Sequence, residues 1–307
     1  MAPLITIGIT SYREGDWLRA CWSSVVGQTD ERWRAVLVLD GGADAATRAV
    51  FDSLDDPRLS KHALADNGGP YPARNRAFAL TETPYHFYLD GDDQLLPDSV
   101  AIVLEQFAAH PEASFVYGDY QLFGARDEVQ RWNPAPTWDD FVPSQPIPGP
   151  CAYKRALWEE LGGYPQELAR GNGDYDLLIG ALERGHTGRH AGRIFYRHRV
   201  GHGRRVSGSY ERRYWETAET IVRRHPVFFA DRQRALGFLA VGYRRSLEAE
   251  LADGHPLRAA ALARRGVERG LWRDRASAGE VLSAAVRGAA RMGRDRLDRI
   301  RTSIQRP

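Results

Sequence analysis

The sequence predicts an α/β domain built on a mostly parallel sheet flanked by helices, followed by an all-α C-terminal extension. Over the first hundred residues, short apolar runs alternate with segments of helical periodicity, and this alternation favours a parallel sheet covered by helices. From about Tyr210 onward only helical periodicity remains. We therefore expect a first domain over residues 1–208 and a helical region over residues 209–307.

Three of the predicted strands run directly into polar residues. The strands and the residues that follow them are Leu4–Thr10 with Ser11 and Tyr12, Ala35–Leu39 with Asp40-Gly41-Gly42, and Tyr85–Leu89 with Asp90-Gly91-Asp92-Asp93. Ligands of open α/β sheets bind beyond the carboxyl ends of the strands. These three polar segments are therefore expected to meet at one edge of the sheet.

Periodicity predicts the remaining elements in order. Helices are predicted over residues 17–26, 99–110, 155–161, 175–184, 215–224, 232–251, 256–269 and 278–304, and further strands over residues 114–117 and 193–197.

Six prolines between residues 134 and 150 predict an irregular connection. Trp132, Trp138 and Phe141 are interleaved with these prolines. Their rings could stack on an acceptor or could pack to hold the connection in place. We favour packing.

The composition is that of an ordinary folded protein, with 43% hydrophobic and 27% charged residues. The 42 basic and 40 acidic residues nearly balance, so no nucleic-acid partner is expected. The two cysteines, Cys21 and Cys151, are too few for a disulfide framework. No window supplies the ~20 apolar residues that span a bilayer, and no targeting pattern is present. The expected location is the cytoplasm.

The segment Tyr88-Leu89-Asp90-Gly91-Asp92-Asp93 carries the strongest chemical signal. Three carboxylates within four residues repel one another unless a cation or a hydrogen-bond network offsets their charge. Hard oxygen ligands suit Mg²⁺ or Mn²⁺, and both ions keep positions open for substrate phosphates. The alternative is a solvated acidic turn, because Asp-Gly is a common turn pair.

Neighbouring segments favour the nucleotide interpretation. Asn67-Gly68-Gly69-Pro70 leads into a helix whose N-terminal amides, together with Arg74, could meet a phosphate. Asp40 could accept a hydrogen bond from a base, and Tyr12 could stack on its ring. Taken singly, each of these segments also fits an ordinary turn.

In this order, the motifs resemble the family 2 glycosyltransferases, which have the GT-A fold. The resemblance covers about 200 residues and rests on Ile5-Thr-Ile-Gly-Ile-Thr-Ser-Tyr12, Ser24-Val-Val-Gly-Gln-Thr29, Val38-Leu-Asp-Gly-Gly42, Asn67-Gly-Gly-Pro70 with Ala73-Arg-Asn75, Tyr88-Leu-Asp-Gly-Asp-Asp93, Leu161-Gly-Gly-Tyr164 and Gly173-Asp-Tyr-Asp-Leu177. It implies a metal-dependent, inverting transfer of a sugar from a nucleotide-diphosphate donor to an acceptor. The acceptor could be a glycan, a lipid-linked sugar or a small molecule.

The resemblance also implies roles for individual residues on the donor side. Thr10, Tyr12 and Asp40 would hold the nucleotide base, Arg74 would approach the base or the diphosphate, and Asp90 would bind the ribose. Asp92 would bind a divalent cation, Mn²⁺ or Mg²⁺.

In the family, an acidic pair precedes a helix and its second member is the catalytic base. Here the matching pair is Gly173-Asp174, so Asp174 takes the role of the base while the first acid is missing. Asp174 could instead cap a helix that starts at Tyr175. Asp176 is the competing candidate for the base.

Further downstream, His198 matches the histidine that the family places near the metal, and His202 is its rival. Arg204 and Arg205 match the basic groups over the diphosphate, where an arginine clamp stabilises charge on the departing phosphate.

Two other functions compete with this interpretation. A catalytically inactive scaffold on the same fold stays open because the acid before Asp174 is missing. A sugar nucleotidyltransferase would need a glycine-rich triphosphate loop after the first strand, and residues 8–13 show none. The basic, amphipathic C-terminal helix could contact the inner face of a membrane, mediate self-association, or cover the rest of the chain.

Overall fold

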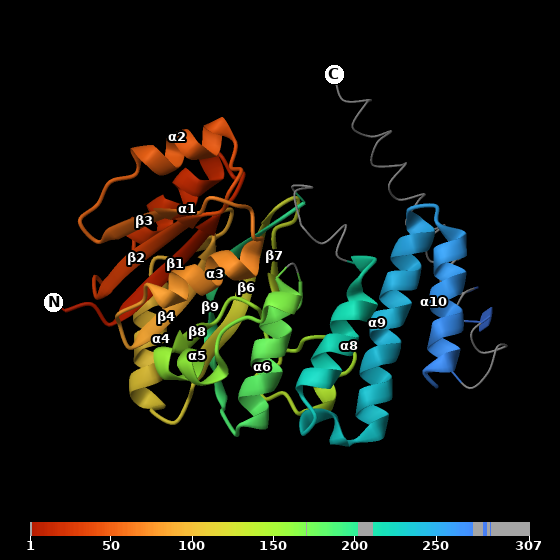
Figure 1. Cartoon of the computed structure of the whole chain (residues 1–307). Coiled ribbons are helices and arrows are strands. Elements are labelled where there is room, and N and C mark those ends of the chain that lie inside the picture. The colour runs from red at the N-terminus through yellow and green to blue at the C-terminus, as the bar shows by residue number, and fades with distance from the viewer. Residues whose placement is uncertain (1, 170, 202–210, 273–278, 281–282, 284–307) are drawn as a thin grey trace. The chain divides into compact units, whose positions relative to one another are not determined.

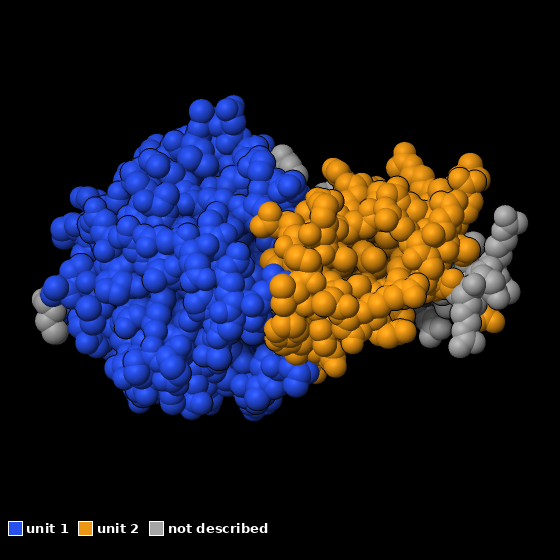
Figure 2. Space-filling view, turned by 60° about the horizontal axis from the view of Figure 1, so that its bottom comes forward, with its two compact units in different colours: residues 1–137, 145–204 blue, residues 138–144, 205–307 orange. Residues whose placement is uncertain are grey.

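A computed structural model describes residues 2–169, 171–201, 211–272, 279–280 and 283 of the chain (Figure 1). The chain divides into two compact units (Figure 2). The first unit contains Met1–Thr137 and Gln145–Arg204, and the second contains Trp138–Ser144 and Arg205–Pro307. The domain boundary between residues 208 and 209 remains a prediction.

A mixed sheet forms the centre of the first unit, with nine strands among the described residues (Figure 1). Its order is β3-β2-β1-β4-β8-β6-β9-β5, and β7 pairs with β6. The first four strands of this order are parallel, as predicted, whereas β8 runs antiparallel to both of its neighbours. The strands are β1 Ile5–Ser11, β2 Trp33–Leu39, β3 Leu59–Ala63, β4 Tyr85–Asp90, β5 Gln94–Leu95, β6 Phe115–Gly124, β7 Glu128–Gln130, β8 Ala152–Lys154 and β9 Gly188–Val200.

Helices bury both faces of this sheet. Side chains of β2 point alternately to the two faces: Leu37 packs in one core with α1, α2 and α4, while Val36 and Val38 pack with Ala73 and Ala77 of α3. Trp158 of α5 stacks on Phe78 of α3 with ring centroids 3.7 Å apart. The helical elements of the first unit are α1 Asp16–Val26, α2 Ala45–Ser53, α3 Pro70–Ala79, α4 Ser99–Ala109, α5 Arg155–Leu161, the 3-10 turn η2 Gln166–Leu168 and α6 Gly173–Glu183.

His86 on β4 is a neutral imidazole enclosed by the core. Its ring stacks on Phe78 at 3.5 Å, and its Nδ1 lies 2.7 Å from Thr81 Oγ1. A Cβ added to Gly8 on the adjacent strand would lie 2.3 Å from the ring, so only glycine fits there. Burial lowers the pKa of His86 to about 3.

Acid should therefore destabilise the protein through His86. Because the folded-state pKa lies below the ordinary value of 6.5, this contribution is complete above pH 6.5 and is lost as the pH falls toward 3. At pH 4 the loss from this group is roughly 3 kcal/mol. Urea denaturation between pH 7 and 4 should show a shallower decline for His86→Gln, whereas His110→Gln, at a half-buried histidine outside this core, should keep the wild-type slope. Equal slopes in the three proteins would contradict the prediction.

The second unit is helical and includes the short segment 138–144. Trp138 stacks on Phe228 at 5.0 Å and Phe141 meets the same ring at 6.1 Å, while Trp132 packs on Tyr120 in the first unit. These contacts confirm the packing interpretation for the three aromatic residues. The elements are η1 Asp139–Phe141, α8 Tyr214–Arg224, η3 Phe228–Ala230, α9 Arg232–Ala252 and α10 Pro256–Glu268.

Helices α9 and α10 pack against each other as a hairpin, with Leu247 against Ala259 and Ala263. The helix predicted over residues 278–304 lies almost wholly outside the described residues. Across the described part of the chain, every helix is too short or too polar to cross a bilayer.

Candidate active site

The polar ends of β1, β2 and β4 meet at one edge of the sheet, as the sequence predicts. The three strands are parallel neighbours, and backbone hydrogen bonds continue between them where the strands end. The Asp40 amide donates to Ser11 O at 2.7 Å, and the Gly91 amide donates to Thr10 O at 2.8 Å. The predicted contacts to the donor base and ribose that follow these strands therefore lie along one short edge of the sheet.

Asp40 connects two loops through hydrogen bonds. Its carboxylate is 5% exposed and accepts hydrogen bonds from the amides of Gly41, Gly68 and Gly69, each at 3.0 Å. A Cβ added to Gly41 would lie 2.3 Å from the Asp66 backbone, so the two loops touch through glycine. In this conformation Asp40 holds the Asn67-Gly-Gly-Pro70 turn, a role that sequence analysis did not anticipate. Its proposed contact to a base remains a prediction.

Asp40→Asn should destabilise the protein by about 2–4 kcal/mol, because charge-assisted bonds are replaced by weaker ones and an amide NH₂ faces backbone donors. Asp44→Asn is the matched control: Asp44 caps α2 through Thr47 N at 2.8 Å, and asparagine caps a helix equally well. Urea denaturation of both variants checks this expectation. A loss for Asp40→Asn no larger than the control's would show that the three amides do not depend on the charge.

Arg74 and Asp90 form an ion pair at the same edge, in which Arg74 is buried and Asp90 is half-buried. Arg74 Nη2 lies 2.8 Å from both carboxylate oxygens of Asp90, and Thr10 Oγ1 donates to Asp90 Oδ1 at 3.2 Å. The guanidinium also lies over the rings of Tyr88 and Tyr71, at 4.4 and 5.0 Å. Three residues that were predicted to bind the nucleotide donor are thus in direct contact: Thr10, Arg74 and Asp90.

Tyr12 lies against the turn that follows β2. A Cβ added to Gly42 would be 3.9 Å from its ring, and the Arg13 guanidinium lies 4.7 Å from the ring centroid. The backbone of Tyr12 is fixed by Glu14, whose carboxylate accepts from Tyr12 N and from Ser11 Oγ, both at 2.5 Å. Burial raises the pKa of Glu14. Sequence analysis did not single out Glu14.

Asp92 sits among other carboxylates. Burial, together with the charges of Asp93, Asp90 and Glu14, raises the pKa of Asp92 to about 8. Because the ionised carboxylate is so unfavourable here, a bound cation would stabilise it. Within the described ranges, no group of three or more acidic, histidine or cysteine side chains is gathered as a complete metal centre.

Asp93 orients the histidine that sequence analysis placed near the metal. Its carboxylate is 0% exposed and accepts from Tyr196 OH at 2.8 Å, His198 Nδ1 at 2.9 Å and Arg199 N at 2.7 Å. Tyr196 and His198 reach it together because alternate residues of β9 share a face. This two-residue spacing was the signal in the sequence that could have linked them to Asp93.

Among the expected phosphate-binding groups, Arg204 and Arg205 lie outside the described residues, as does the rival histidine His202. Arg199 is a described cation that sequence analysis missed. Its Nε donates to Asp92 O at 2.9 Å, and its guanidinium lies 4.8 Å from the Trp17 ring centroid.

Asp174 lies in the first turn of α6 and does not cap it, which corrects the capping alternative. The helix begins at Gly173, and Asn172 occupies the cap position with a left-handed φ of 59°. Asp174 Oδ1 accepts from Tyr71 OH at 2.7 Å and from Tyr175 N at 3.1 Å, and Oδ2 lies 3.4 Å from Gln145 Nε2. Asp174 is half-buried, whereas Asp176 is 3% exposed.

Tyr71 joins this carboxylate to the donor edge, since its ring also lies under Arg74. The structure therefore brings Asp174, Arg74, Asp90 and Thr10 into one chain of contacts. Sequence analysis missed Tyr71, although its place directly after the Asn67-Gly-Gly-Pro70 turn puts it at the same helix end.

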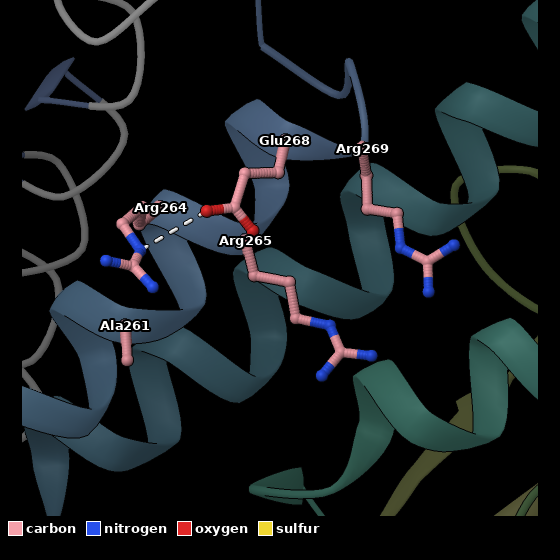
Figure 3. A pocket seen from close by; sticks show the side chains of 5 residues that line it. All are labelled: Ala261, Arg264, Arg265, Glu268 and Arg269. Atoms are coloured by element: carbon pink, nitrogen blue, oxygen red, sulfur yellow. Dashed lines mark ion pairs between the residues drawn. The ribbon is translucent and has the colours of Figure 1, made fainter.

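A cavity of about 410 Å³ lies elsewhere, on α10 of the second unit (Figure 3). It is lined by Ala261, Arg264, Arg265, Glu268 and Arg269, and Arg264 pairs with Glu268 at 3.3 Å. None of the site residues described above lines it, and its other two arginines, Arg265 and Arg269, are also paired, both with Glu219. We assign it no part in the chemistry.

Comparison with known proteins agrees with the geometry. Residues 6–153 match the sequence model of the family described as Glycosyl transferase family 2. A teichoic acid poly(glycerol phosphate) polymerase of Staphylococcus epidermidis is 30% identical over 105 residues, which are 34% of this chain and 15% of that protein. The putative teichuronic acid biosynthesis glycosyltransferase TuaG of Bacillus subtilis is 27% identical over 192 residues, 60% of this chain and 74% of TuaG. The chain spans a fifth or less of the length of two of the curated relatives that it matches.

Solved structures resemble the whole chain. S. aureus TarS 1–349, in complex with UDP-GlcNAc, matches with a TM-score of 0.68 at 16% identity, over 94% of this chain and 92% of TarS 1–349. The mannosyltransferase PcManGT of Pyrobaculum calidifontis, in complex with GDP-Man and Mn²⁺, matches with a TM-score of 0.55 at 17% identity, over 95% of this chain and 87% of PcManGT. The sheet order, the site geometry and the sequence match agree: the chain has the GT-A fold, and its residues 6–153 match glycosyltransferase family 2.

Proposed function

We propose that this protein is a metal-dependent, inverting glycosyltransferase that moves a sugar from a nucleotide-diphosphate donor to an acceptor hydroxyl. One observation carries the proposal: Tyr71 and Arg74 connect an accessible carboxylate, Asp174, to the ion pair at the donor edge. A base and a nucleotide-binding group within one contact network are what direct transfer between two bound substrates requires.

The donor edge suits a nucleoside diphosphate. Asp90 can accept hydrogen bonds from ribose hydroxyls while it stays paired with Arg74, and the ring of the half-buried Tyr12 can stack on a base. The related folds of TarS and PcManGT hold UDP-GlcNAc and GDP-Man, which supports this donor class. Arg204 and Arg205 remain proposed diphosphate contacts.

The residues present fit a divalent cation. Asp92 offers a hard oxygen ligand in a strongly acidic surrounding, and His198 offers an imidazole whose Nδ1 is held by the buried Asp93. A carboxylate behind a histidine is the usual support of a metal-binding imidazole. Mn²⁺ or Mg²⁺ bound there would offset charge on the leaving diphosphate.

Asp174 would act as the general base. Its Oδ2 accepts the proton of the acceptor hydroxyl while that oxygen attacks the anomeric carbon. The bond from the anomeric carbon to the diphosphate oxygen breaks in the same step, and the configuration inverts. Arg199, together with Arg204 and Arg205, would stabilise the negative charge that develops on the leaving group.

Calorimetry with UDP, GDP and dTDP, each with Mn²⁺ and with a chelator, tests the donor and metal assignments. One nucleotide should bind tightly with Mn²⁺ and lose most of its affinity in chelator, because the cation joins Asp92 to the diphosphate. Equal affinity in chelator would remove the metal from the proposal. Absence of binding by all three nucleotides would favour an inactive scaffold instead.

A further inference from the structure

Gly173 occupies the place where the family resemblance leads one to expect the first acid of the catalytic pair. The position is buried beneath the ring of Tyr71. A Cβ added to Gly173 would lie 2.7 Å from Tyr71 Cδ1 and 2.9 Å from both Cγ and Cε1. No side chain fits at position 173 while the ring stays where it is. The missing acid is therefore coupled to the presence of Tyr71.

Tyr71 has little freedom to move away. The residue is 7% exposed, its ring packs on Tyr164 with centroids 4.8 Å apart, and the Arg74 guanidinium lies 5.0 Å from its centroid. Arg74 is in turn held by its ion pair with Asp90, and the backbone of Tyr164 is held by the side chain of Asn75. A ring held in this way presents its hydroxyl in one direction.

That hydroxyl determines how Asp174 is oriented. It donates to Asp174 Oδ1 at 2.7 Å, the shortest hydrogen bond to this carboxylate among those described. The other oxygen, Oδ2, faces Gly149, where an added Cβ would approach it to 2.4 Å. Oδ1 thus accepts the two shorter hydrogen bonds, from Tyr71 OH and Tyr175 N, whereas Oδ2 packs against Gly149 and accepts the longer bond from Gln145 Nε2 at 3.4 Å.

We propose that Tyr71 is the positioning residue of the general base, and that the pair Tyr71 and Gly173 replaces the acid that precedes the base elsewhere in the family. The inference rests on the proposed function for its catalytic part. Because Tyr71 also contacts Arg74, it aligns Asp174 with the donor edge and not only with its own helix.

Tyr71→Phe removes the hydroxyl and keeps the ring. Transfer should lose about 10- to 100-fold in kcat, as expected for a base displaced by about 1 Å, while the KM for the donor stays nearly constant. Tyr164→Phe is the matched control: its hydroxyl is also buried, its ring packs on that of Tyr71, and no hydrogen-bond partner reaches it from the described part of the chain. That variant should keep wild-type kcat. Equal losses in the two variants, or a loss confined to KM, would overturn the positioning role.

A swap tests the replacement itself. Gly173→Glu alone should lose activity and lower the melting temperature, because the new side chain meets the Tyr71 ring. The double variant Tyr71→Ala with Gly173→Glu should recover both the melting temperature and part of kcat relative to Tyr71→Ala. A double variant no better than either single one would contradict the replacement.

A stability cycle separates this inference from the proposed function. The melting temperatures of wild type, Tyr71→Phe, Asp174→Ala and the double variant can be compared without any substrate. Tyr71→Phe should lower the melting temperature clearly in the wild type and by much less when Asp174 is absent. Non-additivity in a protein that transfers no sugar would support the contact and reject the proposed function, whereas strict additivity would reject the contact.

Discussion

Asp174→Asn is expected to lower the transfer rate by ~10²–10⁴-fold, the usual cost of losing a general base. The amide keeps the size of the side chain and can still accept the Tyr71 hydroxyl, but it cannot take the acceptor's proton. Nucleotide affinity and melting temperature should stay close to wild type, since the donor contacts of Arg74 and Asp90 are unchanged. Single-turnover kinetics with the preferred nucleotide sugar, together with calorimetry, measures both quantities.

Asp176→Asn is the control for this prediction. Two residues along a helix correspond to a rotation of about 200°, so the carboxylates of Asp174 and Asp176 cannot face the same anomeric carbon. Asp176 is 3% exposed, and its substitution should lower stability while the folded fraction turns over normally. If Asp176→Asn were folded but inactive and Asp174→Asn active, the base would be Asp176.

Asp92→Asn should abolish the Mn²⁺ dependence of nucleotide binding and reduce turnover by at least about 10³-fold, because a cation at the leaving diphosphate is worth several kcal/mol in the transition state. Asp55→Asn makes the same change of charge at an exposed position outside the site. It should leave binding and turnover unaltered. Calorimetry with and without Mn²⁺, followed by rate measurements, distinguishes the two variants.

Although Asp92→Asn should reduce turnover, it should stabilise the fold when no metal is present. The pKa of Asp92 is raised from 3.8 to about 8, so the folded state favours its protonated form. Its contribution to stability therefore declines as the pH rises from about 4 to 8 and is smallest above that. In chelator, the melting temperature of Asp92→Asn should exceed that of wild type increasingly from pH 5 to pH 9. A difference that is constant with pH would show that Asp92 ionises normally.

The sequence by itself determined β1, β2, β4, β6 and β9, most of the helices, and the edge at which the polar segments meet. It did not predict β3, β5, β7, β8 or α2. Apolar runs and helical periodicity are local signals, and they located β1, β2 and β4 to within about two residues. Parallel strands place their carboxyl ends together, so Thr10, Asp40 and Asp90 could be expected at one edge without knowledge of any contact. The packing of Trp138 and Phe141 was also predictable, since a long proline-rich connection needs anchors.

The tertiary structure alone decided which polar groups touch. Asp40 accepts hydrogen bonds from two amides of a loop 28 and 29 residues away, Asp93 reaches across 105 residues to His198, and Tyr71 across 103 to Asp174. Such partners depend on how separate elements close over the sheet, and hydrogen-bond geometry is sensitive to fractions of an ångström. Residue type and spacing identify a carboxylate as a candidate base. Only the packed neighbours decide which oxygen of that carboxylate accepts the short hydrogen bonds and which accepts a longer, weaker one.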